Sequence, residues 1–331
     1  MRLAVVAAAL VLGSGTASAE PCRRAEVADP APGRSEAVLP AEARIARDLT
    51  LSNNTLVWSS GESLWRLRLD GNVCAERIAG RPAEAASAVD SLRVAVAGDS
   101  VVALTRTALM ELAPTVAAAG TPVAQLPETP QTFVMADGAL YTSVWRSDAI
   151  YRVDLATGTA VELAQLPKGS GRFGFLLAVH GDTLYAASWG QRTLTAIPLG
   201  TGIPKTIARG LAAGPTALSL DDTHAYLYLE SGPKFPGAVV AIELAKPGAK
   251  PRTLATGIAN SDSLLRDGDW LYLRSDARGK RGAIDLVRVP LAGGAPERVA
   301  VDLPSPARPI GADAEAIYLD GGTRIVRLQK P

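Results

Sequence analysis

A short pattern recurs seven times along the chain and constrains its fold more than any other feature. Each copy has a pair of turn-forming residues, up to two further residues, and then an apolar pair. The first apolar residues fall at positions 56, 101, 140, 184, 225, 271 and 317, with a mean step of 43.5 residues. So regular a spacing indicates one structural unit repeated seven times. The copies are Asn53–Val57, Gly98–Val102, Asp137–Tyr141, Gly181–Tyr185, Asp221–Tyr226, Gly268–Tyr272 and Asp313–Tyr318.

Each unit has the pattern of four short strands. In the sixth copy the apolar runs are Leu264–Leu265, Trp270–Leu273, Asp285–Pro290 and Glu297–Val301, separated by Asp-Gly and Gly-Gly turns. Such turns favour tight hairpins because they require positive φ. A four-stranded antiparallel meander repeated every ~40–45 residues is typical of a β-propeller. The sequence therefore predicts an all-β, seven-bladed β-propeller.

The last unit is one strand short, which predicts how the ring closes. Its three strands are expected near Ala307–Gly311, Ala316–Asp320 and Thr323–Gln329, after which the chain ends. Residues 36–39 precede the first blade, and we expect them to supply the missing strand, which removes an open sheet edge. The alternative is a ring of six blades with one unit outside it.

The first residues are typical of a cleaved secretory signal. Arg2 precedes the apolar run Leu3–Leu12, and Ala17–Ala19 supplies small residues for cleavage. The run is about half the length that a membrane-spanning helix needs, and no later segment is long enough. We expect a signal peptide at residues 1–19, a polar tail at 20–33, a propeller at 34–331, and a periplasmic or secreted protein without a transmembrane segment.

The expected export bears on the oxidation state of the two cysteines, Cys22 and Cys74. In an oxidising compartment they are expected to form one disulfide, which ties the N-terminal tail to the first blade. The alternative is a pair of unlinked thiols. Two cysteines cannot build a cysteine-rich zinc site, and histidine is equally scarce in the chain.

The composition narrows the class of partner. Lys and Arg number 34 and Asp and Glu 33, for a net charge of +1, and this balance argues against a nucleic-acid-binding protein. With 47% hydrophobic and 20% charged residues, the chain is not of the disordered class.

The repeat has a recognisable family character. Val289–Pro296 resembles the repeat ending of exported bacterial propellers of the TolB-like and YWTD-type group, and Leu184-Tyr185 and Leu271-Tyr272 resemble the tyrosine that opens their second strand. The resemblance covers about residues 50–328, and no copy has the full Tyr-Trp-Thr-Asp string. It implies a binding or assembly platform, although a minority of such propellers are lactonases or lyases, and the fold does not decide between them.

Strand order assigns the irregular loops to one face. Loops between second and third strands share a rim with the connections between blades, and we expect blades 3 to 6 to present basic and aromatic side chains there. This rim is the predicted site for an anionic or extended partner, since aromatic and Arg side chains are enriched in binding hot spots. The alternative is ordinary solvated loop charge with tryptophans packed between blades. The candidate ligand-binding residues are Trp145, Arg146, Lys168, Arg172, Phe173, Trp189, Arg192, Lys234, Phe235, Arg278, Lys280 and Arg281.

Signals for catalysis are weak. His180 and His224 are expected in turns on the opposite face, and neither lies near a distinctive Ser that would complete a Ser-His-Asp set. At the entrance of the channel, Asp262 and Asp90 begin inner strands, as does Arg308, and this mixture of charges disfavours a calcium site. The glycine-rich stretches join strand to strand, unlike phosphate loops. We therefore predict no catalytic residue, metal or cofactor.

Together these observations favour an exported, non-catalytic propeller that binds a protein or another envelope component. The alternative function is a lactonase-type or lyase-type enzyme that acts on a small molecule in the central channel. A repeat protein with a purely structural role and no discrete ligand is a third reading.

Overall fold

The structure is a computed structural model that describes most of the chain beyond residue 22. The predicted signal peptide (residues 1–19) and Cys22 lie outside the described residues. Every regular element in the described part is a β-strand, and no helix there is long and apolar enough to cross a membrane. The described residues are 23–24, 26–39, 45, 47–52, 55–60, 63–68, 74–80, 93–97, 100–104, 108–112, 121–126, 130–144, 146–171, 174–248, 250–276 and 282–331.

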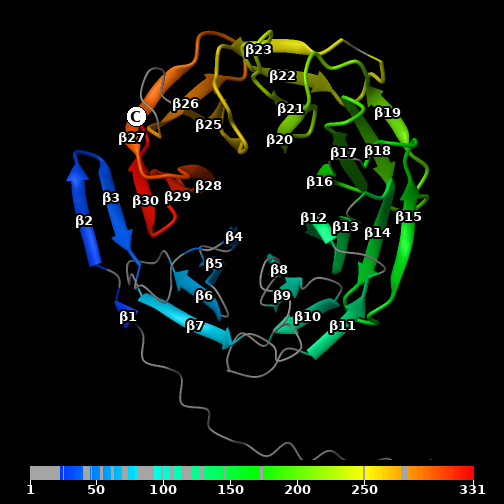
Figure 1. Ribbon diagram of the computed structural model, residues 1–331, viewed down its shortest axis with the longest axis horizontal. Coiled ribbons are helices and arrows are strands. Elements are labelled where there is room, and N and C mark those ends of the chain that lie inside the picture. The colour runs from blue at the N-terminus through cyan, green and yellow to red at the C-terminus, as the bar shows by residue number, and fades with distance from the viewer. Residues whose placement is uncertain are drawn as a thin grey trace, which may run out of the picture.

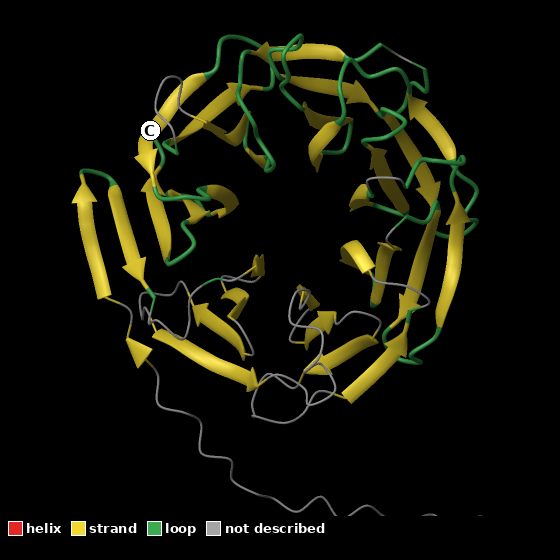
Figure 2. Ribbon diagram, in the orientation of Figure 1, coloured by secondary structure: helices red, strands yellow, loops and turns green. Residues whose placement is uncertain are grey.

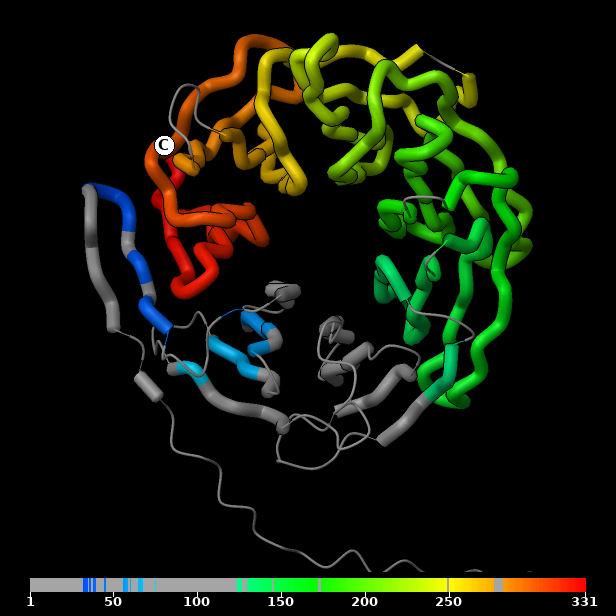
Figure 3. The backbone as a smooth tube through the Cα atoms, viewed as in Figure 1, coloured from blue at the N-terminus to red at the C-terminus, as the bar shows by residue number. Residues whose placement is uncertain are grey.

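Within these residues, seven antiparallel sheets are arranged in a ring around a central axis (Figure 1 and Figure 2). The chain passes once around the ring and builds one sheet after another (Figure 3). In six sheets, four strands that are consecutive in the sequence are also neighbours in space. The seventh sheet takes its strands from both ends of the chain. This confirms the predicted all-β propeller of four-stranded antiparallel units. We number the blades 1 to 7 in chain order.

The strands of each blade have the following bounds, innermost strand first. Blades 1 to 3 contain β4 (Arg47–Ser52), β5 (Thr55–Ser60), β6 (Ser63–Arg68), β7 (Cys74–Gly80), β8 (Arg93–Ala97), β9 (Ser100–Leu104), β10 (Ala108–Leu112), β11 (Thr121–Gln125), β12 (Pro130–Ala136), β13 (Ala139–Val144), β14 (Ala149–Asp154) and β15 (Ala160–Gln165). Blades 4 to 6 contain β16 (Phe175–His180), β17 (Thr183–Ser188), β18 (Thr193–Pro198), β19 (Lys205–Ala208), β20 (Pro215–Leu220), β21 (His224–Leu229), β22 (Ala238–Glu243), β23 (Arg252–Thr256), β24 (Leu265–Asp267), β25 (Trp270–Asp276), β26 (Ile284–Pro290) and β27 (Glu297–Leu303). Blade 7 contains β28 (Arg308–Ala312), β29 (Ala316–Asp320), β30 (Arg324–Gln329), β3 (Arg34–Val38) and β2 (Glu26–Ala31).

The N-terminal part of the chain completes blade 7. β3 pairs with β30 in antiparallel orientation, with Glu36 opposite Val326 and Val38 opposite Arg324. In Figure 1 the blue β3 lies beside the red β30. The predicted closure by residues 36–39 is confirmed, and the closing strand starts slightly earlier, at Arg34.

The segment expected to be a polar tail, residues 20–33, contains two further strands. β2 pairs with the outer side of β3, so blade 7 has five strands. β1 (Arg23–Arg24) pairs with β7 in blade 1, where Arg24 lies opposite Cys74. The N-terminal segment therefore contacts the blades on both sides of the closure. The apolar pattern did not predict β2, because a strand at the edge of a sheet can be held by backbone hydrogen bonds without an apolar face.

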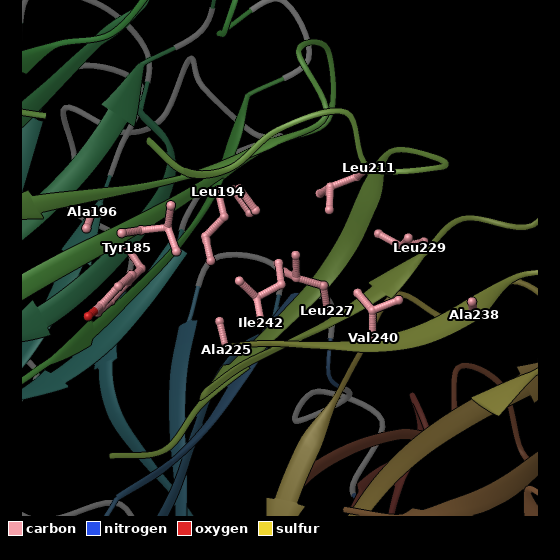
Figure 4. Close-up of a cluster of buried hydrophobic side chains, with 13 residues drawn as sticks. Tyr185, Leu194, Ala196, Leu211, Ala225, Leu227, Leu229, Ala238, Val240 and Ile242 are labelled. Atoms are coloured by element: carbon pink, nitrogen blue, oxygen red, sulfur yellow. The ribbon is translucent and has the colours of Figure 1, made fainter. Parts of the chain in front are cut away.

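The hydrophobic core lies between neighbouring blades. One cluster joins blades 4 and 5, where Leu194 of β18 packs with Leu227 of β21 and Ile242 of β22 (Figure 4). These three side chains are essentially inaccessible to solvent. Burial of each such side chain contributes roughly 1.5–3 kcal/mol. Similar clusters join blades 3 and 4, 5 and 6, 6 and 7, and 7 and 1, so inter-blade packing holds the ring together.

The tight turns follow the repeat. Between β12 and β13 the turn residues Asp137 and Gly138 both have positive φ, 49° and 69°. Type I′ hairpins require this conformation at both positions, and their twist matches that of the flanking strands. The Asp-Gly pair of the third copy thus forms the hairpin turn that pairs β12 with β13.

Candidate binding rim

The loops between second and third strands and the connections between blades lie on one face, which we call the loop rim. The opposite face, made of the turns between first and second and between third and fourth strands, is the turn rim. The predicted residues that the structure describes are Arg146, Lys168, Trp189, Arg192, Lys234 and Phe235, and all lie in segments of the loop rim. The remaining candidates, Trp145, Arg172, Phe173, Arg278, Lys280 and Arg281, lie outside the described residues.

The connection from blade 3 to blade 4 is held against the loop of blade 3. The carboxylate of Asp148 accepts hydrogen bonds from the backbone N–H groups of Gly169 (2.9 Å) and Gly171 (2.7 Å). A Cβ atom at Gly171 would lie 1.7 Å from the carbonyl oxygen of Ser147, so only glycine fits this contact. Lys168 is exposed on this fixed segment.

The loop of blade 4 is bound to the same connection. The Ser188 hydroxyl donates to the carbonyl oxygen of Ser170 at 2.6 Å and accepts from the backbone N–H of Gln191 at 3.1 Å. The Gln191 amide donates to the carbonyl oxygen of Lys168 at 3.3 Å. Arg192 ends this loop with a positive φ of 53°, a conformation rare for non-glycine residues. The loops of neighbouring blades therefore form one connected surface.

Trp189 is the exposed aromatic residue of this surface. Its side chain is 36% exposed, and its indole N–H donates to a carboxylate oxygen of Glu230 in blade 5 at 2.8 Å. A Cβ atom at Gly214 would lie 2.3 Å from Cδ1 and Nε1 and 2.6 Å from Cε2 of the indole. These nearly equal distances place the face of the ring against Gly214. The ring is therefore oriented by a hydrogen bond at its edge and by a glycine at its face.

Exposed basic residues lie in the same loop as Trp189 and in neighbouring segments of the loop rim. Lys168, Arg192 and Lys234 are exposed, as is Arg209 in the connection from blade 4 to blade 5. A backbone hydrogen bond of 3.1 Å from the N–H of Leu211 to the carbonyl oxygen of Arg192 holds that connection beside the blade 4 loop. Among the ion pairs of the described chain, none involves these four cations. Their charge is available to an anionic partner.

Sequence reasoning missed three parts of this site and misjudged a fourth. Glu230 and Gly214 carry no local signal, because their contacts with Trp189 cross from one blade to the next. Arg209 lies in a short connection without a motif. Phe235 differs from the expectation of a presented side chain: it is half-buried and packs against the core cluster between blades 4 and 5.

At the channel entrance of blades 5 to 7, charges are paired. Asp262 accepts from Nε and Nη2 of Arg308 at 2.8 and 2.7 Å, and Nη1 of Arg274 lies 3.6 Å from its other oxygen. Arg274 also donates to Asp276 at 3.0 Å, and the amide of Asn260 donates to the same carboxylate at 2.8 Å. The mixed charge predicted for this entrance is thus an ion-paired network.

Asp320 lies at the end of β29 near this network and is 6% exposed. Burial raises the pKa of its carboxyl group, and the hydrogen bond from the backbone N–H of Gly322 (2.8 Å) and the charge of Arg308 offset only part of that effect. The negative charge of the nearby Asp262 adds to the rise of this pKa.

The two histidines lie on the turn rim, where the repeat placed them. His180 ends β16, with Nε2 3.6 Å from a carboxylate oxygen of Asp222, and His224 begins β21. Within the described ranges, no group of three or more His, Cys, Asp and Glu side chains is arranged to hold a metal ion. Asp90 lies outside those ranges.

Comparisons with known proteins show the fold. No protein-family model matches the sequence, and no curated protein matches it significantly. Among solved structures, the RRP9 WD40 repeats align with a TM-score of 0.64 at 11% identity, over 92% of this chain and 99% of that one. The computationally designed protein Ika8 aligns with a TM-score of 0.58 at 11% identity, over 88% and 98% of the two chains.

A third similar structure is bacterial. The extracellular domain of the putative one-component system BT4673 from B. thetaiotaomicron aligns with a TM-score of 0.61 at 11% identity, over 91% of this chain and 40% of that one. At such low identity these likenesses concern the architecture alone. The chain is a β-propeller of the WD40-like architecture.

Proposed function

We propose that this protein is an exported, non-catalytic propeller that binds an anionic envelope component or protein through the loop rim of its middle blades. The observation that carries this proposal is the oriented, partly exposed Trp189, on a rim whose neighbouring loops and connections carry four exposed cations that form no ion pair within the described chain, Lys168, Arg192, Arg209 and Lys234. An aromatic ring fixed before binding loses little conformational entropy on contact. Unpaired cations attract an anionic partner and hold it more weakly at high salt.

Two sequence features support the remaining parts of this proposal. Residues 1–19 have the pattern of a cleaved signal, which favours a periplasmic or secreted location. The repeat ending at Val289–Pro296 supports kinship with TolB-like and YWTD-type propellers, and in the structure it forms the end of β26 and the following turn. The paired state of Asp262 at the channel entrance favours binding over catalysis there, because Arg308 and Arg274 already occupy its oxygens.

The test measures binding of the exported protein to native envelope fractions by co-sedimentation over a range of salt concentrations. Replacement of Lys168, Arg192 and Lys234 by alanine should reduce the bound fraction and its salt dependence. The matched control replaces Lys205, Lys246 and Lys250, which are exposed on the turn rim, and should bind as the native protein does. Equal binding by both triple variants would contradict the proposed rim.

A further inference from the structure

We infer that Trp189 is a stacking platform for one sugar ring of an acidic polysaccharide, with the carboxylate or sulfate groups of that chain held by the exposed cations of the rim. This inference rests on the proposed function and names the ligand class of the same rim. It uses only described residues of blades 3 to 5 and their connections.

The platform is rigid before any ligand arrives. Gly214 lies against one face of the indole, and the N–H at its edge is 2.8 Å from Glu230. The preceding residue, Ser188, bonds to the carbonyl oxygen of Ser170, which ties the base of the loop to the neighbouring connection. The exposed 36% of the side chain is therefore offered in one fixed orientation. An aromatic ring held in this way loses little conformational entropy when a flat ligand stacks on it.

The surroundings of the ring suit a hydroxylated ligand better than a protein surface. Protein interfaces bury about 800 Å² on each partner around an apolar centre that is depleted in Lys and Glu. Trp189 is instead hydrogen-bonded to Glu230, its own loop carries the exposed polar Gln191, and Gln191 donates to the backbone of the exposed Lys168.

The other exposed large hydrophobic side chains of the described chain do not extend this surface. Val161 lies on the outer strand β15, Val301 on the outer strand β27, and Ile203 in a turn on the turn rim. Among the described residues, the exposed apolar area of the site is thus about that of one ring. A pyranose matches it, because one face of the sugar presents C–H groups while its hydroxyl groups lie at the edge and bond to polar neighbours.

The charge around the platform specifies an acidic sugar chain. Lys168, Arg192, Arg209 and Lys234 come from four consecutive loops or connections along the rim, so they follow a path rather than a single point. A polysaccharide with an acidic group at regular intervals can contact several of them at once, and such multivalency raises the overall affinity. Glu230 is the acidic exception, and its role is to orient the indole.

The experiment uses the full exported protein and four defined probes. Polygalacturonate is the acidic polysaccharide and dextran the neutral one, while polyglutamate and a single-stranded thymidine oligonucleotide represent acidic polymers of other classes. Binding is measured by isothermal titration and by retardation in affinity electrophoresis. We expect polygalacturonate to bind more tightly than the other three probes.

Four variants test the platform. Trp189→Ala should weaken polygalacturonate binding by about tenfold or more, whereas Trp189→Phe should retain most of it. Gly214→Ala should weaken binding without any change in charge, because the added methyl group displaces the indole. Glu230→Gln keeps a hydrogen-bond acceptor for the indole and removes a negative charge, so it should bind polygalacturonate a few-fold more tightly.

Matched controls come from the turn rim. Ile203→Ala removes an exposed apolar side chain, 70% exposed, and Lys205→Ala removes an exposed cation, and neither should change binding. Circular dichroism and the unfolding midpoint establish that each variant is folded. Trp189→Phe and Glu230→Gln keep the test decisive if Trp189→Ala or Gly214→Ala does not fold.

The outcomes separate the two proposals. If polygalacturonate binding needs Lys168 and Arg192 but is unchanged in Trp189→Ala, the stacking platform is wrong and the proposed rim stands. If polyglutamate or the oligonucleotide binds at least as tightly as polygalacturonate, the ligand class is wrong. If no anionic probe distinguishes the native protein from the triple-cation variant, the proposed function fails as well.

Discussion

Arg324 donates a hydrogen bond to the buried carboxylate of Glu36 across the seam where the two ends of the chain meet. Glu36 lies on β3 and Arg324 begins β30, and Arg34 contacts the same carboxylate, with its Nε 2.8 Å away. The Glu36 side chain is 2% exposed, whereas that of Arg324 is 39% exposed, so the carboxylate is the buried member of the pair. Closure of the ring therefore adds a second cation, from the other end of the chain, to a buried carboxylate that Arg34 of the same strand already contacts.

Loss of this carboxylate should weaken the closure. Glu36→Gln leaves two guanidinium groups without their anion, and we expect a loss of about 3 kcal/mol in the free energy of unfolding, because removal of one partner from a buried pair is costly. Chemical denaturation measures the change. Glu315→Gln is the matched control, since Glu315 pairs with Arg327 but is 79% exposed, and it should cost at most about 1 kcal/mol. Equal losses in both variants would contradict a special role for Glu36.

The same pair predicts a dependence on pH. Burial alone would raise the pKa of Glu36, but the hydrogen bonds from Arg324 and Arg34 outweigh it and hold the pKa below the ordinary value of 4.5. The stabilisation is thus present above pH 4.5 and is lost as pH falls through the folded-state pKa. The difference in stability between the native protein and Glu36→Gln should shrink in acid, and a constant difference from pH 7 to pH 3 would argue against this assignment.

Asp221 organises the turn of the fifth repeat. One oxygen accepts from the backbone N–H groups of Thr223 and His224, both at 2.7 Å, and the other accepts from the phenol of Tyr226 at 2.6 Å. Asp221→Ala removes these three hydrogen bonds and should cost about 3 kcal/mol, and Tyr226→Phe removes one and should cost about 1 kcal/mol in denaturation experiments, because each lost hydrogen bond contributes about 1 kcal/mol. In an exposed turn of similar kind, the Asp154 carboxylate accepts hydrogen bonds from the backbone N–H groups of Ala156 and Thr157. Asp154→Ala should lower the free energy of unfolding by less than Asp221→Ala does. A larger loss in Asp154→Ala would contradict this account.

The hydrogen bond between Tyr226 and Asp221 also predicts how the phenol titrates at alkaline pH. Burial and the neighbouring Asp221 carboxylate raise the pKa of Tyr226 to about 12. Because the folded-state pKa lies above the ordinary 10.0, the stabilisation is present below pH 10 and is lost as pH rises toward the folded value. Absorbance titration of the native protein and of Tyr226→Phe should differ by one phenol that ionises late. A difference that titrates near pH 10 would show that the bond is not formed.

Asp320 should behave in the opposite way to Glu36. Burial raises the pKa of this carboxyl group, so its ionisation opposes folding as pH rises through the folded-state pKa. Asp320→Asn keeps an acceptor for the backbone N–H of Gly322, and it should be more stable than the native protein at pH 7, on the order of 1 kcal/mol. The advantage should vanish near pH 3, where the native carboxyl group is protonated. Lower stability of the variant at pH 7 would show that the charge of Arg308 dominates.

A disulfide between Cys22 and Cys74 stays a prediction, and the pairing of β1 with β7 supports it. Arg24 lies opposite Cys74, so the described chain next to residue 22 is already in the first blade. Peptide mapping without reductant should recover the two cysteines in one linked peptide. Cys74→Ser should lower the free energy of unfolding by roughly 3–4 kcal/mol, the value for a loop of about 50 residues. Recovery of two free thiols from the exported protein would contradict the prediction.

The regular parts of the fold were predictable because they depend on local patterns. The strand Ala316–Asp320 was predicted with the bounds that β29 has, and the closing strand within two residues of its start. Alternating apolar residues and turn pairs act over a few neighbours, so they can be read along the chain. The outer strand β2 was missed because it pairs through its backbone and carries little of that pattern.

The order of the blades, the closure of the ring and the face on which Trp189 lies all followed from the sequence, since a repeat imposes the same strand directions on every unit. Only the tertiary structure placed Glu230 and Gly214 against the indole, packed the half-buried Phe235 against the core between two blades, and paired Asp262 with Arg308. These contacts join residues of different blades. Their partners are chosen by how neighbouring sheets pack, and no short stretch of sequence records that choice.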